Sequence, residues 1–162
     1  MSADPFAELQ DGPALSFAQW PGDPPVPHVA RGVYTIWKGD QLLFVGLAGL
    51  GELPDKRPKK PWGLHRRLAA HAGGRRAYDQ LSCHIADRFV LDTLEDDDLD
   101  GIVAGERSMD ALVKAWVAEH LSYRYAQVST TAVARDLEQR VRRGALTAGQ
   151  PFLNPLRTKT PA

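Results

Sequence analysis

The sequence predicts a mixed α/β (α+β) fold in which helices flank a small antiparallel sheet. Two short apolar runs, at 32–37 and 42–48, are separated only by turn residues, which is the pattern of a β-hairpin. Both faces of these runs are apolar, so helices are expected to cover much of the sheet. Later segments show either the helical or the strand-like spacing of apolar residues.

Residues 1–28 are predicted to form an extended arm. They contain six of the chain's twelve prolines, including the run PGDPPVP at 21–27. Proline lacks a backbone N–H and fixes its own φ angle, so such a segment is a poor former of helix or sheet. We therefore expect a proline-rich N-terminal arm over 1–28 and one compact domain over 29–162.

The remaining elements follow the hairpin in order. Residues 49–61 form a proline- and lysine-rich loop, and leucines four apart predict a helix over 62–72 that a Gly-Gly pair ends. Residues 78–94 suit a helix or a mixed segment. A serine N-cap predicts a helix over 108–121, and residues 122–128 alternate as a strand does. Thr130 or Thr131 is the predicted N-cap of a last helix that runs to Arg143.

Composition favours a protein of a reducing compartment. The single cysteine, Cys83, excludes a disulfide framework and a cysteine-rich zinc site. The acidic start of the chain lacks the pattern of a signal peptide, and no apolar run reaches the roughly 18–20 residues of a membrane span. We expect a cytoplasmic protein without a membrane partner.

Charge is balanced overall but unevenly distributed. The chain has 20 basic and 20 acidic side chains, with a basic block at 56–76 and an acidic block at 92–100. These blocks are either a surface for a polyanion with the acids kept away from it, or two solvated loops of opposite sign. The motif EDDDLD at 95–100 has no histidine and no regular ligand spacing, so we interpret it as a solvated acidic loop rather than a metal site. The side chains expected to contact nucleic acid are Lys56, Arg57, Lys59, Lys60, Arg66, Arg75 and Arg76.

Five short motifs occur in order between residues 32 and 154: GVY, FVGLA, GLHRRLAAH, ARDLEQRVRRG and PFLN. Each motif alone is weak, but the ordered set resembles the GIY-YIG nuclease superfamily. The arginine–histidine pair in the third motif is most similar to the restriction-endonuclease branch. The resemblance implies a small three-stranded antiparallel sheet flanked by helices, with a helical insertion at about 75–120 before the third strand.

The resemblance implies a metal-dependent DNA endonuclease that hydrolyses phosphodiester bonds. Tyr34 would be the general base or orient the attacking water, and it would work best if a neighbour such as His71 lowered its pKa. Arg67, four residues before His71 on the same helix face, would stabilise the transition state as a fixed cation. Glu138 would hold one Mg²⁺ or Mn²⁺. Asn154 would orient Glu138 or contact the phosphate.

Simpler interpretations of the same residues stay open. Tyr34 could pack a sheet face, and Arg67 and His71 could be surface residues of a helix. Glu138 could pair with Arg135 or Arg142, three and four residues away on the same helix, and Asn154 could cap a turn.

The second motif departs from the family, because phenylalanine stands at 44 where the family has tyrosine, and leucine at 47 where lysine is frequent. Either Tyr34 with His71 suffices, or the site is impaired. For an active enzyme we expect duplex DNA as substrate and a homodimer on a palindromic site. The alternatives are a repair or structure-specific nuclease, a nucleic-acid-binding module without catalysis, and a protein-interaction domain.

Overall fold

The structure is a computed structural model and describes residues 4–156. Residues 1–3 and 157–162, the outer ends of the predicted arm and domain, lie outside the described residues. The predicted mixed fold with an antiparallel sheet is confirmed, although the sheet has four strands rather than three. Its order is β1 (Leu15–Ser16), β6 (Ser122–Gln127), β3 (Gly32–Lys38) and β4 (Gln41–Ala48), and a separate small parallel sheet pairs β2 (Val29–Ala30) with β5 (Trp62–Gly63).

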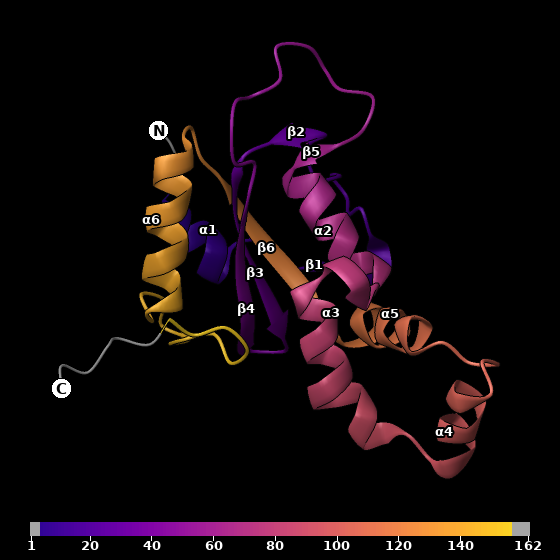
Figure 1. Cartoon of the computed structure of the whole chain (residues 1–162). Helices are drawn as coiled ribbons and strands as arrows, with labels where there is room; N and C mark the ends of the chain where they lie inside the picture. The colour runs from indigo at the N-terminus through magenta and orange to yellow at the C-terminus, as the bar shows by residue number, and fades with distance from the viewer. Residues whose placement is uncertain (1–3, 157–162) are drawn as a thin grey trace, which may run out of the picture.

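Helices cover both faces of the four-stranded sheet (Figure 1). The α-helices of the described chain are α1 (Pro5–Asp11), α2 (Leu64–Gly73), α3 (Gln80–Ile85), α4 (Asp96–Val103), α5 (Met109–His120) and α6 (Thr131–Arg142). The first and last of these pack on one face, whereas α2, α3 and α5 lie on the other. Within residues 4–156 we find no helix with the length and apolar character of a membrane span.

Strand β3 separates two hydrophobic cores. Tyr34 and Ile36 belong to the core on the α2, α3 and α5 side, while Val33 and Trp37 belong to the core under α1 and α6. Alternate side chains of a strand point to opposite faces, so a strand covered on both sides is apolar throughout. This arrangement confirms that helices cover the hairpin.

The predicted helix ends agree with the structure because they depend on local capping. The Ser108 side chain accepts a hydrogen bond from the backbone N–H of Ala111 at the start of α5, and Thr130 accepts one from Val133 at the start of α6. Gly74 adopts a left-handed conformation that ends α2. The predicted loop at 49–61 holds no helix or strand before β5.

The prediction of an extended arm over 1–28 is wrong for the described residues. Asp4 caps α1, whose first residue is Pro5, a position where proline loses no helical hydrogen bond. Leu9 is fully buried in the core under α6, and Phe17 is buried on the opposite side of the sheet. Strand β1 then pairs with β6. The segment therefore belongs to the folded core, where Pro5 starts a helix and Pro21, Pro24 and Pro25 lie in turns.

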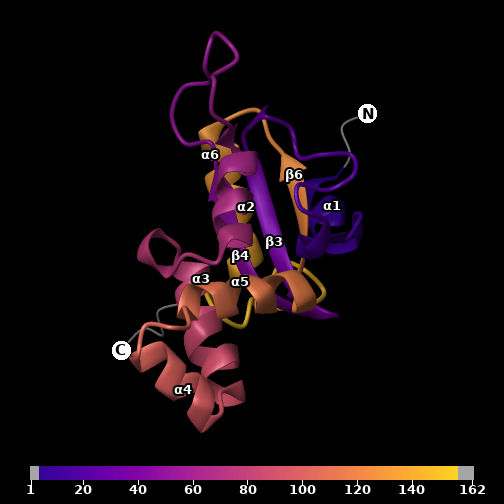
Figure 2. The same ribbon diagram turned by 90° about the vertical axis from the view of Figure 1, so that its right-hand side faces the viewer.

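The acidic block is also not the predicted loop. Glu95 and Asp98 form a reciprocal capping box, so the carboxylates of EDDDLD begin helix α4. Between α3 and α4, residues 86–93 continue as π and 3-10 turns, which fits the predicted mixed segment. Figures 1 and 2 show α4 and the basic loop 49–61 at opposite ends of the molecule. The acidic block therefore lies far from the lysine-rich part of the basic block.

Candidate active site

An open cleft of about 890 Å³ lies beside β4, which is an edge strand of the sheet. One wall comes from α2 and from the segment that leads into α3, and the other comes from α6 and residues 153–154. Residues from all five sequence motifs meet here. Tyr34, Arg67, Glu138 and Asn154 line the cleft, and His71 contacts Tyr34 from the buried side.

Gly46 makes room for the Tyr34 ring at the cleft. The two residues are direct partners across β3 and β4, so their side-chain positions share one face of the sheet. A Cβ atom at residue 46 would lie 2.2 Å from the Tyr34 hydroxyl oxygen and 2.3 Å from Cζ. The phenol can therefore occupy this place only because residue 46 has no side chain.

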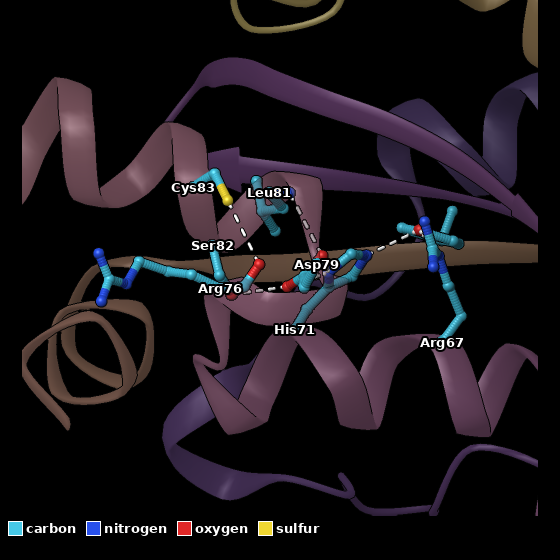
Figure 3. A network of polar contacts seen from close by, with 8 residues as sticks. Arg67, His71, Arg76, Asp79, Leu81, Ser82 and Cys83 are labelled. Atoms are coloured by element: carbon cyan, nitrogen blue, oxygen red, sulfur yellow. Dashed lines mark hydrogen bonds and ion pairs between the residues drawn. The ribbon is translucent and has the colours of Figure 1, made fainter. Parts of the chain in front are cut away.

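A buried chain of hydrogen bonds connects Tyr34, His71 and Asp79. The Tyr34 hydroxyl lies 2.7 Å from His71 Nε2. On the other side of the ring, His71 Nδ1 lies 2.9 Å and 3.0 Å from the two carboxylate oxygens of Asp79 (Figure 3). All three residues are buried. The contact between His71 and Tyr34 that the resemblance implied is present, and His71 is not a residue of the helix surface.

Asp79 determines which nitrogen of His71 carries the proton. Its carboxylate caps α3, where it accepts hydrogen bonds from the Leu81 amide and the Ser82 hydroxyl. Burial alone would raise the pKa of Asp79, but the hydrogen bonds from His71 and Ser82 hold it below its ordinary value. Because an ionised carboxylate can only accept, His71 Nδ1 is the donor to Asp79. In neutral His71, Nε2 is then free to accept the Tyr34 hydroxyl proton.

The pKa of Tyr34 is raised overall, whereas its role as a base would be served best by a lowered one. Burial raises the pKa of the Tyr34 hydroxyl well above its ordinary value, and the positive charge of Arg67 offsets only part of this effect. Arg67 Nε donates a hydrogen bond to the Tyr34 oxygen at 3.3 Å. Tyr34 is therefore a protonated phenol at neutral pH, with Arg67 and His71 on its oxygen.

Glu138 brings the negative charge of the cleft. Of the described residues that line the cleft, Glu138 alone is acidic. Its side chain is 11% exposed, and its Oε1 accepts a hydrogen bond from Arg142 at 3.0 Å. One of the two ion pairs considered for Glu138 is thus present. Residues 4–156 contain no group of three or more histidine, cysteine, aspartate or glutamate side chains placed to hold a metal.

Asn154 ties the end of the described chain to the edge of the sheet. Its side-chain oxygen accepts a hydrogen bond from the Val45 amide at 3.1 Å, and its side-chain nitrogen donates one to the Val45 carbonyl at 2.7 Å. The amide thus pairs with β4 as a neighbouring strand would. Its side chain makes no direct hydrogen bond to Glu138, but its backbone carbonyl accepts one from Nε of Arg142, which also bonds Glu138, at 2.9 Å.

The predicted nucleic-acid contacts fall into two groups. Arg66 is exposed and lines the cleft, while Arg75 is exposed in the segment between α2 and α3. Arg76 donates to Asp110 at 2.7 Å, so its charge is already paired. The other four predicted contacts lie on the exposed loop 49–61, and they are Lys56, Arg57, Lys59 and Lys60.

Phe44 fills the place next to His71. Its ring meets the imidazole edge-on at a centroid distance of 5.8 Å, and the residue is buried at the cleft. Leu47 is half-buried and packs against the core under α6. Phe44 therefore covers one side of the His71 ring but offers no hydroxyl. Leu47 contributes to core packing and supplies no positive charge.

Comparisons with known protein families, curated proteins and solved structures gave no match to this chain. The assignment of a function therefore depends on the geometry of the cleft.

Sequence reasoning missed Asp79, and with it the Leu81 amide and the Ser82 hydroxyl that donate hydrogen bonds to its carboxylate. The signal for Asp79 as a cap was present, because an aspartate directly before an apolar helix segment is a typical N-cap. Its pairing with His71 had no local signal, because the glycine stop of α2 and the 3-10 turn Arg76–Tyr78 separate the two residues. Arg142 was considered only as a partner of Glu138, although it also lines the cleft.

Proposed function

We propose that this protein is a metal-dependent DNA endonuclease that hydrolyses phosphodiester bonds, with a GIY-YIG-like site of the restriction type. The observation that carries the proposal is the buried chain from Tyr34 through His71 to Asp79, which ends at an open cleft whose other wall holds Glu138. Phosphodiester hydrolysis needs a proton acceptor for water, cations around the phosphate and a place for a hard metal ion.

The proton path we propose follows the hydrogen bonds. Tyr34 takes a proton from the attacking water while it passes its own proton to His71 Nε2 at 2.7 Å. This coupled transfer avoids a free phenolate, which the raised pKa of Tyr34 disfavours. The Asp79 carboxylate stabilises the imidazolium that forms, because it lies within 3.0 Å of His71 Nδ1.

Through Arg67, binding of the substrate phosphate would control whether water reaches the Tyr34 hydroxyl. The Tyr34 side chain has no exposed surface, while Arg67 is exposed to the cleft and holds the Tyr34 oxygen. A phosphate is a stronger partner for a guanidinium than a phenol is, because its charged oxygens accept paired hydrogen bonds. Binding of the scissile phosphate would draw Arg67 away from Tyr34 and allow water to reach the hydroxyl.

We propose that the cleft binds one divalent metal ion through a single protein carboxylate. Glu138 would hold Mg²⁺ or Mn²⁺, since carboxylate oxygens suit hard cations and Arg142 fixes only its Oε1. The remaining ligands would be water and phosphate oxygens. When bound, the ion would neutralise charge on the phosphate and on the leaving oxygen.

The distribution of cations favours DNA as the substrate. The cleft is lined by three arginines, Arg66, Arg67 and Arg142. The basic loop 49–61 follows directly after β4, which borders the cleft. Binding to duplex DNA through these side chains would be strongly salt-dependent. We further propose a cytoplasmic enzyme that acts as a homodimer on a two-fold symmetric site.

A nucleic-acid-binding module without catalysis is the second candidate, and Phe44 is the observation that favours it. Phenylalanine packs against His71 but supplies no hydroxyl at the cleft. If the chemistry needs that hydroxyl, the cations of the cleft would still bind DNA while no strand is cut.

Cleavage of supercoiled plasmid tests the proposal. The full chain is incubated with Mg²⁺ or Mn²⁺, and parallel reactions contain EDTA or the variant Glu138→Ala. Glu119→Ala is the matched control, because Glu119 is an exposed glutamate of α5 that does not line the cleft. We expect nicks or discrete fragments with the wild type and Glu119→Ala, and none with EDTA or Glu138→Ala.

Two other outcomes would contradict the proposal. If the protein binds DNA in a salt-sensitive way but cuts neither methylation-free nor structured DNA, the binding module is favoured. If the protein neither binds nor cuts DNA, both candidates are excluded and the protein-interaction domain remains.

A further inference from the structure

The cleft wall at 78–84 has a chemistry that hydrolysis does not use. Tyr78, Gln80 and His84 line the cleft from this side. They are an aromatic ring, a neutral amide and an imidazole, whereas the neighbouring α2 wall presents the guanidinium groups of Arg66 and Arg67. This wall therefore offers positive charge along α2 and stacking and hydrogen-bonding groups along 78–84.

Tyr78 is 93% exposed, although large aromatic side chains are usually well covered. Scattered exposed apolar residues are ordinary, but Tyr78 lies on the wall of the cleft that also holds Tyr34 and Glu138. The side chains of two neighbouring residues make polar contacts, Arg76 with Asp110 and Asp79 with His71. The short 3-10 turn Arg76–Tyr78 thus holds an uncovered ring at the cleft.

Gln80 and His84 are four residues apart on α3 and so share one helix face. Gln80 is exposed and His84 is half-buried. Glutamine can make paired hydrogen bonds to the edge of adenine, and imidazole can bond to base edges as donor or acceptor. Neither side chain offers the permanent charge that suits a phosphate.

The size of the cleft agrees with a ligand larger than a phosphate. Its volume of about 890 Å³ lies within the range of roughly 300–1,000 Å³ typical of small-molecule sites. A nucleotide fits such a space with its phosphate toward the cations of α2 and α6.

We propose that the 78–84 wall binds a nucleobase adjacent to the scissile phosphate, with the base stacked on Tyr78 and its edge hydrogen-bonded by Gln80 and His84. This inference rests on the proposed nuclease function and names its substrate more closely. A base stacked within a duplex has no free face, so the base beside the cut would be unpaired or flipped out of the duplex when it binds.

Binding of two DNA duplexes tests this inference. One duplex is fully paired, and the other carries 2-aminopurine as a single bulged base, whose fluorescence falls when it stacks on an aromatic ring. Both are titrated with the full chain in Ca²⁺ at several salt concentrations. We expect tighter binding of the bulged duplex and quenching of its 2-aminopurine.

The variants separate stacking from phosphate contact. Tyr78→Ala should weaken binding of the bulged duplex by about 5- to 150-fold and abolish quenching, and Tyr78→Phe should keep both. Lys59→Ala is the control for a phosphate contact, and it should lower the salt slope of binding by about 1 while quenching persists. Because residues 59 and 78 are exposed, these variants should unfold at the wild-type temperature.

Three results would overturn the inference: equal wild-type affinity for the two duplexes, quenching that persists in Tyr78→Ala, or full binding by that variant. If the wild type cuts plasmid while any of these holds, the base site is wrong and the nuclease proposal stands. If no plasmid is cut but Tyr78-dependent quenching occurs, the base site stands and the nuclease proposal fails.

Discussion

Replacement of Asp79 by asparagine tests the proposed proton path with little change in shape. The Asp79 carboxylate accepts from the Leu81 amide, the Ser82 hydroxyl and His71 Nδ1. Asparagine has one acceptor oxygen and one donor group. When its oxygen stays with the Leu81 amide, that oxygen still lies beside His71 Nδ1, but the NH₂ group replaces the second oxygen and the negative charge is lost. His71 Nε2 then becomes a much weaker base toward Tyr34, because its imidazolium has no ionised carboxylate beside it.

The expected effect on rate follows from the role of the lost base. General acid–base catalysis contributes about 10²–10⁴-fold, so Asp79→Asn should slow cleavage by at least about 100-fold, or roughly 2.7 kcal/mol. The effect on stability should be smaller. One poorly satisfied group in a buried network costs about 1–3 kcal/mol, which lowers Tm by about 2–10 °C in a chain of this size.

Acid unfolding provides a second measurement of the same residue. The folded pKa of Asp79 lies below its unfolded value of about 3.9. The unfolded chain therefore binds the proton first, and the stability that Asp79 contributes is present above about pH 4 and lost as pH falls through the folded pKa. Between about pH 2 and pH 5, the free energy of unfolding should rise more steeply with pH in the wild type than in Asp79→Asn.

The assay is single-turnover cleavage of supercoiled plasmid with excess protein, followed from pH 6 to pH 9. Ser82→Ala is the matched control, because it removes one donor to Asp79 and leaves the carboxylate beside His71. A rate for Asp79→Asn within about threefold of the wild type at every pH would refute the proton path. An equal loss in Ser82→Ala would show that the network acts only through stability.

Three further predictions concern the surroundings of the site. Gly46→Ala places a Cβ 2.2 Å from the Tyr34 oxygen, so it should lower the free energy of unfolding by about 1–3 kcal/mol and abolish cleavage. The control Gly73→Ala, which has nothing within 4 Å, should leave both unchanged or raise stability. Asn154→Ala removes both bonds to Val45 and should cost about 1–3 kcal/mol in urea unfolding, and an unchanged midpoint would contradict its proposed role as a strand substitute. The double variant Lys59→Ala/Lys60→Ala should lower the salt slope of DNA binding by about 2, and the cleavage rate at saturating protein should not change.

Sequence patterns were sufficient wherever the structure depends on neighbouring residues. The KGDQ turn, the Ser108 and Thr130 caps and the glycine after α2 all act within a few residues, and each was predicted correctly. The shared face of Arg67 and His71 also follows from helical spacing alone.

Predictions failed where a segment was interpreted only from its content of proline or acidic residues. Prolines predicted an extended arm, but Pro5 stands at the first position of α1 and Leu9 is buried beneath the sheet. The acidic run predicted a loop, but Glu95 and Asp98 cap a helix. In both cases the position of a residue within an element outweighed its average preference.

The chemistry of the cleft was decided by tertiary structure. Only the folded chain brings the Asp79 carboxylate to His71 and buries Tyr34 so that its pKa is raised rather than lowered. Asn154 pairs with Val45 across more than a hundred residues of sequence. Capping and periodicity are local properties that a sequence displays directly. Burial and contacts between distant segments depend on which elements pack together, and no local pattern of this chain encodes them.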